Sequence, residues 1–332
     1  MNQAIESREL ITLDGLEVLV RATYHKTPPT IYTTQQGPNQ PSRIGVLFLN
    51  SLTLPRAATG DSSVYWADAF AESGYPSFRI DLPGLGDTGG DLPIDLLGFI
   101  NTGGYAAITA AKVKELVERF NLAGVVVVGH CAGAASALYA ASLAKECVGL
   151  ILMDPYFHLP RAIRPKLRQN LSDWALRSRV GGLLSNIYDV LRKIRLFLRG
   201  NAPPENANFP LLRVWREMAS AGLPILLFKA PSRKAPGTKP RVGEFDYIKH
   251  VLELAGRKGQ VVIRLIEGTD HSFANRSGRA AVRRHTEQWL SERFPLAEFE
   301  GAAAVPLPSA AGDKKGYGKN AESSHAARAV SR

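Results

Sequence analysis

The sequence of 332 residues contains only two cysteines, and none of its apolar runs approaches the about 20 residues needed to cross a bilayer. Two thiols are too few for a disulfide-stabilised scaffold, and the spacing of Cys131 and Cys147 fits no metal site. The first residues lack the basic-then-apolar pattern of a signal peptide. We therefore expect a cytoplasmic protein without a transmembrane segment, metal or cofactor, in which each thiol requires its own explanation.

Acidic residues are also scarce, with 30 Asp and Glu against 41 Lys and Arg, but the imbalance is local. Residues 1–155 carry 15 acidic and 10 basic side chains, whereas residues 156–222 carry 4 and 12, and residues 223–296 carry 7 and 14. The basic residues are scattered around apolar helical stripes and lack interleaved aromatic residues, so the charge pattern does not indicate a nucleic-acid partner.

Short apolar runs without alternation recur along the chain and are typical of strands buried on both faces. Two segments of alternating apolar and polar residues flank the turn at Asp14 and Gly15, and they predict a β-hairpin that precedes the buried strands. The predicted buried strands are residues 44–49, 77–80, 125–128, 148–153, 224–228 and 261–266. Helical patterns separate most of these strands or follow the last one, at residues 63–73, 106–120, 132–144, 247–256 and 277–293. The alternation predicts an α/β fold with a mostly parallel sheet and helices on both faces.

About seventy residues separate the runs at 148–153 and 224–228, far more than one crossover helix requires. We predict a core from residues 1–155 and 223–296, with a basic helical cap at 156–222 inserted before the penultimate strand. The helical stripe at residues 183–198 could make weak contact with a membrane surface. Residues 297–332 are poor in large apolar side chains and are predicted to form a disordered tail.

The strongest chemical signal is the run Gly129-His130-Cys131-Ala132-Gly133, which lies where a buried strand meets an Ala-rich helix. A G-x-S-x-G turn in this context exposes a nucleophile, and here cysteine replaces serine. The helix N-terminus favours the reactive thiolate, and the backbone N–H of Ala132 could donate to an oxyanion. The alternative is that Cys131 only packs as a small apolar residue, which is the interpretation we favour for Cys147.

Four stretches in a fixed order extend this signal: FLNSLTLPRA, FRIDLPGLGDTGGD, VVGHCAGA and LIEGTDHSF. The sequence resembles the α/β-hydrolase superfamily over about residues 8–295, and within it the serine aminopeptidase-like hydrolases associated with exosortase and polysaccharide systems. The resemblance implies an α/β-hydrolase fold and a triad in the chain order nucleophile, acid and histidine.

The resemblance implies that His271, after the last predicted strand, is the general base. The superfamily's acid usually follows the strand at 224–228, but the first carboxylate after it is Glu244. Asp246 is the preferred acid and Asp154, at the end of an earlier strand, is the alternative. Asp246 begins a predicted helix, where aspartate often serves only as a cap.

The resemblance also places a second oxyanion donor after the run at 44–49, in a loop that carries glycine in the superfamily. Here the loop is Asn50-Ser51-Leu52, so Ser51 and Leu52 are the candidates for the backbone donor and Asn50 is a structural or polar-pocket residue. Asp81 and Asp87 match a turn that is structural in relatives.

A thiolate with a histidine base predicts an acyl hydrolase or acyltransferase that acts on a small ester or thioester through an acyl-cysteine. The basic cap could attract an anionic carrier such as coenzyme A or phosphopantetheine. The alternative is a non-catalytic binding protein of the same fold, for which the absent acid after the strand at 224–228 is the main argument.

Overall fold

A computed structural model describes residues 7–14, 18–29, 43–159, 202–231, 245–256 and 259–296. Eight strands form one sheet in the order β1-β2-β4-β3-β5-β6-β7-β8. The first two, β1 (Arg8–Leu13) and β2 (Val20–His25), form the predicted hairpin, and β2 is antiparallel to β4. All the other neighbouring strands are parallel. Their bounds are β3 Ile44–Phe48, β4 Ser77–Ile80, β5 Gly124–His130, β6 Cys147–Met153, β7 Ile225–Lys229 and β8 Val261–Leu265.

The central strands are buried on both faces, as their unbroken apolar runs predicted. Along β5, Val125 and Val127 belong to one apolar cluster, and Val126 and Val128 belong to a second cluster on the opposite face. Strands β3, β6 and β7 alternate between the same two clusters. The sheet therefore separates two cores, and each core needs its own covering helices.

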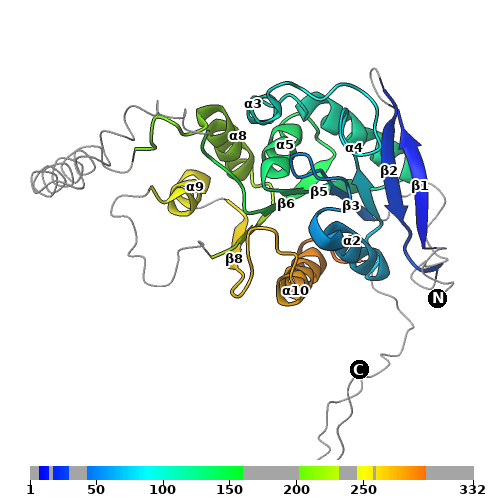
Figure 1. Ribbon diagram of the computed structural model, residues 1–332. Helices are drawn as coiled ribbons and strands as arrows, with labels where there is room; N and C mark the ends of the chain where they lie inside the picture. The colour runs from blue at the N-terminus through cyan, green and yellow to red at the C-terminus, as the bar shows by residue number, and fades with distance from the viewer. Residues whose placement is uncertain are drawn as a thin grey trace, which may run out of the picture. The chain divides into compact units, whose positions relative to one another are not determined.

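Helices cover both faces of the sheet (Figure 1). One face packs against the apolar residues of α2 (Ser62–Glu72) and α10 (Arg276–Arg293). The other face packs against α3 (Leu96–Asn101), α4 (Ala106–Phe120), α5 (Ala132–Ala141), α8 (Phe209–Ser220) and α9 (Tyr247–Ala255). A short 3₁₀ helix, η2 (Thr59–Asp61), precedes α2. The prediction of a mostly parallel sheet with helices on both faces is confirmed.

One helix of the predicted cap, α8, packs in the hydrophobic core. Helix α8 lies inside the segment 156–222, but its Leu211 and Trp215 are buried in the same cluster as α5, and the Trp215 indole donates to the carbonyl of Val251 in α9 (2.8 Å). The apolar face of this amphipathic helix packs against α5 and α9 on one side of the sheet. Residues 160–201, which include the stripe at 183–198, lie outside the described residues, and so does the predicted tail.

All of the described residues lie within one compact unit, Met1–Ala297. Within the described ranges, no helix is both long and apolar enough to cross a membrane.

Candidate active site

The predicted strand-to-helix turn lies between β5 and α5, with Cys131 as the only residue separating them. Cys131 has φ 58° and ψ −119°, a conformation that L-residues rarely adopt. Its neighbours explain how so tight a turn is built. A Cβ on Gly129 would lie 2.3 Å from the carbonyl oxygen of Gly133, and one on Gly133 would lie 2.3 Å from that of Asn50. Both glycines are therefore required for the close approach of helix, strand and loop.

His271 lies beside Cys131, in the loop between β8 and α10. Its Nδ1 is 2.5 Å from Oδ2 of Asp154, and its side chain also hydrogen-bonds the thiol of Cys131. The hydrogen bond to Asp154, followed by the one to Cys131, outweighs burial and raises the pKa of His271 to about 9. A carboxylate, an imidazole and a thiol are thus connected in series.

The carboxylate in this series is that of Asp154, the alternative from the sequence, and not that of Asp246, the preferred choice. Asp154 follows β6, and its backbone N–H donates to the carbonyl of Phe228 in β7 (2.8 Å). Asp246 instead caps α9, because its carboxylate accepts from the backbone N–H of Lys249 (3.0 Å). Asp246 is therefore not the carboxylate that the structure places at His271, and its contacts are those of a helix cap.

Lys229 also contacts the Asp154 carboxylate, through Oδ1, the oxygen that does not face His271. Burial disfavours the ionised form of Asp154, but the hydrogen bonds from His271 and Lys229 and their positive charges lower its pKa overall. Lys229 is the last residue of β7, the strand at whose end the resemblance led us to look for the acid. A cation there holds a carboxylate supplied by the neighbouring strand β6.

The thiol of Cys131 is half-buried and surrounded by donors. Burial opposes its ionisation, but hydrogen bonds from the His271 side chain, the Ala132 N–H and the Ser51 hydroxyl lower its pKa together with the charge of His271. Cys147 is the opposite case, because burial raises the pKa of its thiol to about 12. Of the two thiols, only that of Cys131 has a lowered pKa and is therefore the more easily ionised.

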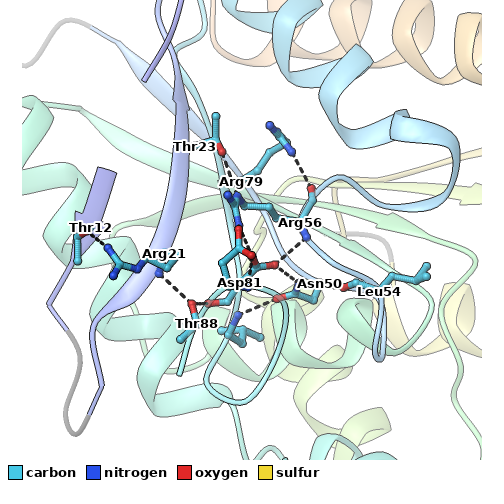
Figure 2. Close-up of polar contacts among 11 residues, drawn as sticks. Thr12, Arg21, Thr23, Asn50, Leu54, Arg56, Arg79, Asp81 and Thr88 are labelled. Carbon is cyan, nitrogen blue, oxygen red and sulfur yellow. Dashed lines mark hydrogen bonds and ion pairs between the residues drawn. The ribbon is translucent and has the colours of Figure 1, made fainter. Parts of the chain in front are cut away.

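The loop after β3 brings Ser51 to the thiol. Figure 2 shows how Asn50 of this loop is held by Asp81. The Asn50 amide donates to Asp81 Oδ1 (2.8 Å) and to the carbonyl of Leu54 (3.0 Å), and its own oxygen accepts from the Leu82 N–H (2.7 Å). All of these bonds are internal to the loops, so Asn50 has a structural role. Leu52, the other candidate donor, has a positive φ of 53° and contacts the apolar cluster around α5.

Asp81 is fully buried and is the centre of this network. Its carboxylate accepts from the backbone N–H groups of Arg56 (2.7 Å) and Asp87 (3.1 Å), and the Arg56 guanidinium forms an ion pair with both aspartates. A Cβ at Gly86 would collide with the same carboxylate. The motif around Asp81 and Asp87 is therefore structural, as expected.

His130 and Asp270 position the His271 loop. His130 Nε2 donates to the carbonyl of His271 (2.6 Å), and burial lowers the pKa of His130 to about 4, so its ring is neutral at neutral pH. The Asp270 carboxylate accepts from the backbone N–H of Ser272 (2.9 Å) and shapes the loop.

Tyr156 and Lys229 are the site residues that we did not predict from sequence. The Tyr156 hydroxyl lies 3.3 Å from Nε2 of His271 and is hydrogen-bonded to Cys131. Lys229 is the last residue of β7 and Tyr156 follows β6, so both lie at the strand ends that carry the site, which was the available signal. Among the described residues, no group of three or more His, Cys, Asp or Glu side chains is arranged to hold a metal ion.

A parallel sheet with a nucleophile turn after its central strand defines the class of α/β hydrolases. The model of the alpha/beta hydrolase family matches residues 46–311, and the chain belongs to this family. An esterase from Pyrococcus furiosus is similar in structure, with a TM-score of 0.54 and 13% sequence identity over 88% of this chain and 94% of that one. The esterase domain of a Rhodothermus marinus protein has a TM-score of 0.50 and 15% identity over 86% and 98% of the two chains. No curated protein matches the sequence.

Proposed function

We propose that this chain is an acyl hydrolase or acyltransferase for small ester or thioester substrates, with Cys131 as nucleophile, His271 as base and Asp154 as acid. One observation carries the proposal, namely that the His271 ring is hydrogen-bonded to the Asp154 carboxylate on one side and to the Cys131 thiol on the other. The names of the esterases with the same fold point in the same direction.

The arrangement supports a two-step reaction. His271 takes the thiol proton at Nε2 while Nδ1–H donates to Asp154, whose negative charge stabilises the imidazolium. The sulfur attacks the acyl carbon, and the N–H of Ala132 and the hydroxyl of Ser51 donate to the developing oxyanion. The proton on His271 then passes to the leaving group, and water or another acceptor returns a proton to His271 when it releases the acyl group.

The case for a non-catalytic binding protein rested on the absent acid after β7. That argument loses its basis, because Asp154 bonds the histidine from the neighbouring strand. The cytoplasmic location and an anionic acyl carrier remain predictions, and the basic segment that motivated the carrier lies mostly outside the described residues.

The test is a covalent adduct. Short p-nitrophenyl esters and acyl thioesters should acylate Cys131, and mass spectrometry of the quenched protein should place the added mass on its peptide. We expect Cys131→Ala to lose at least about 10³-fold in kcat/KM, since the nucleophile is removed. Cys147→Ala is the matched control and should retain turnover. Full activity of Cys131→Ala would show the proposed function to be wrong.

A further inference from the structure

The sheet order divides the donors around Cys131 into two groups. Ser51 follows β3, and Tyr156 and Asp154 follow β6, while β5, which leads to Cys131, lies between β3 and β6. The oxyanion donors Ser51 and Ala132 therefore belong to the β3 and α5 side, and the Tyr156 hydroxyl belongs with His271 on the β6 side. A substrate whose carbonyl oxygen points toward Ser51 directs its leaving group toward His271 and Tyr156.

The Tyr156 ring is held in place by its neighbours. It lies 5.4 Å from the His271 ring centroid, and it makes an edge contact with His158 (5.6 Å), which itself stacks on Tyr247 of α9 (5.6 Å). The side chain is nevertheless accessible, because Tyr156 is 38% exposed. Packing therefore positions its hydroxyl beside the thiol, while part of the side chain remains exposed.

Resting on the proposed function, we propose that Tyr156 is a catalytic residue that donates a hydrogen bond to the leaving atom of the substrate, and that it favours oxygen esters over thioesters. An ester oxygen is a good acceptor for a phenol O–H, whereas a thioester sulfur is a weak one. The benefit should be largest when the departing alkoxide is strongly basic and smallest when it is already a stable anion.

One proton is transferred in this step, and it passes from the thiol through His271 to the leaving group. The C–S bond forms with a proton from the thiol held on His271 Nε2, and when the C–O bond breaks, that proton passes to the departing oxygen to give the alcohol. Tyr156 keeps its proton throughout and contributes only the hydrogen bond. Burial, together with the negative charge of Cys131, raises the pKa of Tyr156 to about 12, so the hydroxyl remains a donor over the working pH range.

The experiment compares Tyr156→Phe with the unaltered protein on ethyl, phenyl and p-nitrophenyl esters and an ethyl thioester of one acyl group. We expect kcat/KM to fall about thirtyfold for the ethyl ester and about twofold to threefold for the p-nitrophenyl ester and the thioester. Tyr75→Phe is the control, because it also removes a tyrosine hydroxyl, one that donates to the carbonyl of Phe294 (3.0 Å). Tyr75 precedes β4 and therefore lies away from the strand ends that carry the site. The Tyr75→Phe variant should leave the ratios of kcat/KM between the four substrates unchanged.

The outcomes separate this inference from the proposed function. An equal loss on all four substrates, or none, would overturn the role of Tyr156, and a normal acyl adduct on Cys131 in the same variant would leave the proposed function standing. Absence of the adduct in the unaltered protein would overturn both. A loss that increases with the pKa of the leaving alcohol, and is small for the thioester, supports the role of Tyr156.

Discussion

Two buried aspartates follow parallel strands on opposite sides of β5: Asp81 follows β4 and Asp154 follows β6. Both form an ion pair with a cation, Arg56 for Asp81 and Lys229 for Asp154. They differ in the remaining partners. Asp81 accepts from backbone N–H groups and an amide, none of which changes charge, whereas Asp154 accepts from an imidazole that titrates. The same residue type therefore builds a loop in one place and tunes a proton acceptor in the other.

The largest expected effect on kcat/KM comes from replacing Asp154, the aspartate that is hydrogen-bonded to His271. Asp154→Asn keeps the shape but removes the charge that stabilises the imidazolium and fixes its tautomer, so kcat/KM for esters should fall about 10³-fold or more. Asp246→Asn is the matched control; it weakens a helix cap by about 1 kcal/mol at most and should leave kcat/KM within about twofold. Steady-state kinetics on both variants decide the assignment, and a greater loss from Asp246→Asn would restore Asp246 as the acid.

The next largest effect is expected from Asp81, the structural aspartate, and it concerns the free energy of unfolding. Asp81→Asn leaves the Arg56 guanidinium without its buried partner, and breaking such a pair costs about 3 kcal/mol. We expect denaturant unfolding to show that loss while kcat/KM of the folded protein falls less than tenfold. If Asp81→Asn lowered kcat/KM as far as Asp154→Asn with unfolding unchanged, the distinction between the two networks would be wrong.

The smallest effect sharpens the comparison within the Asp154 site. Lys229→Met removes the positive charge beside the Asp154 carboxylate, which raises the pKa of Asp154. The carboxylate charge is then no longer compensated by lysine, so it stabilises the imidazolium more strongly and the pKa of His271 also rises. The ion-paired site is lost as His271 deprotonates near pH 9, so the alkaline limb of kcat/KM should move upward by up to about one pH unit. Lys229→Arg should restore the original limb, and an unmoved limb in Lys229→Met would exclude this tuning role.

The sequence predicted most of the scaffold because its signals are local. A strand buried on both faces leaves an unbroken apolar run, and the two glycines around Cys131 are required by close contacts of the turn itself. Helix α8 was assigned to a cap because its sequence position, inside a long insertion, carries no information about which surface its apolar stripe meets.

The acid could not be chosen from the sequence for a related reason. Asp154 and Asp246 both follow a plausible strand or loop, and no local pattern in the sequence tells which carboxylate reaches His271. Asp154 is in reach because β6 neighbours β5 and because its backbone adopts a positive φ of 47°. The same limit applies to Tyr156, whose separation from His271 in sequence is 115 residues.

The burial of Cys147 has a practical consequence. Because the pKa of its thiol is raised to about 12, a thiol-directed dye added at neutral pH should attach only at Cys131, so the native chain already carries a single addressable sulfur. A stoichiometric fluorescent label would then count functional sites molecule by molecule. Protection from that label by a compound library would reveal ligands without any assumption about the acyl group they carry.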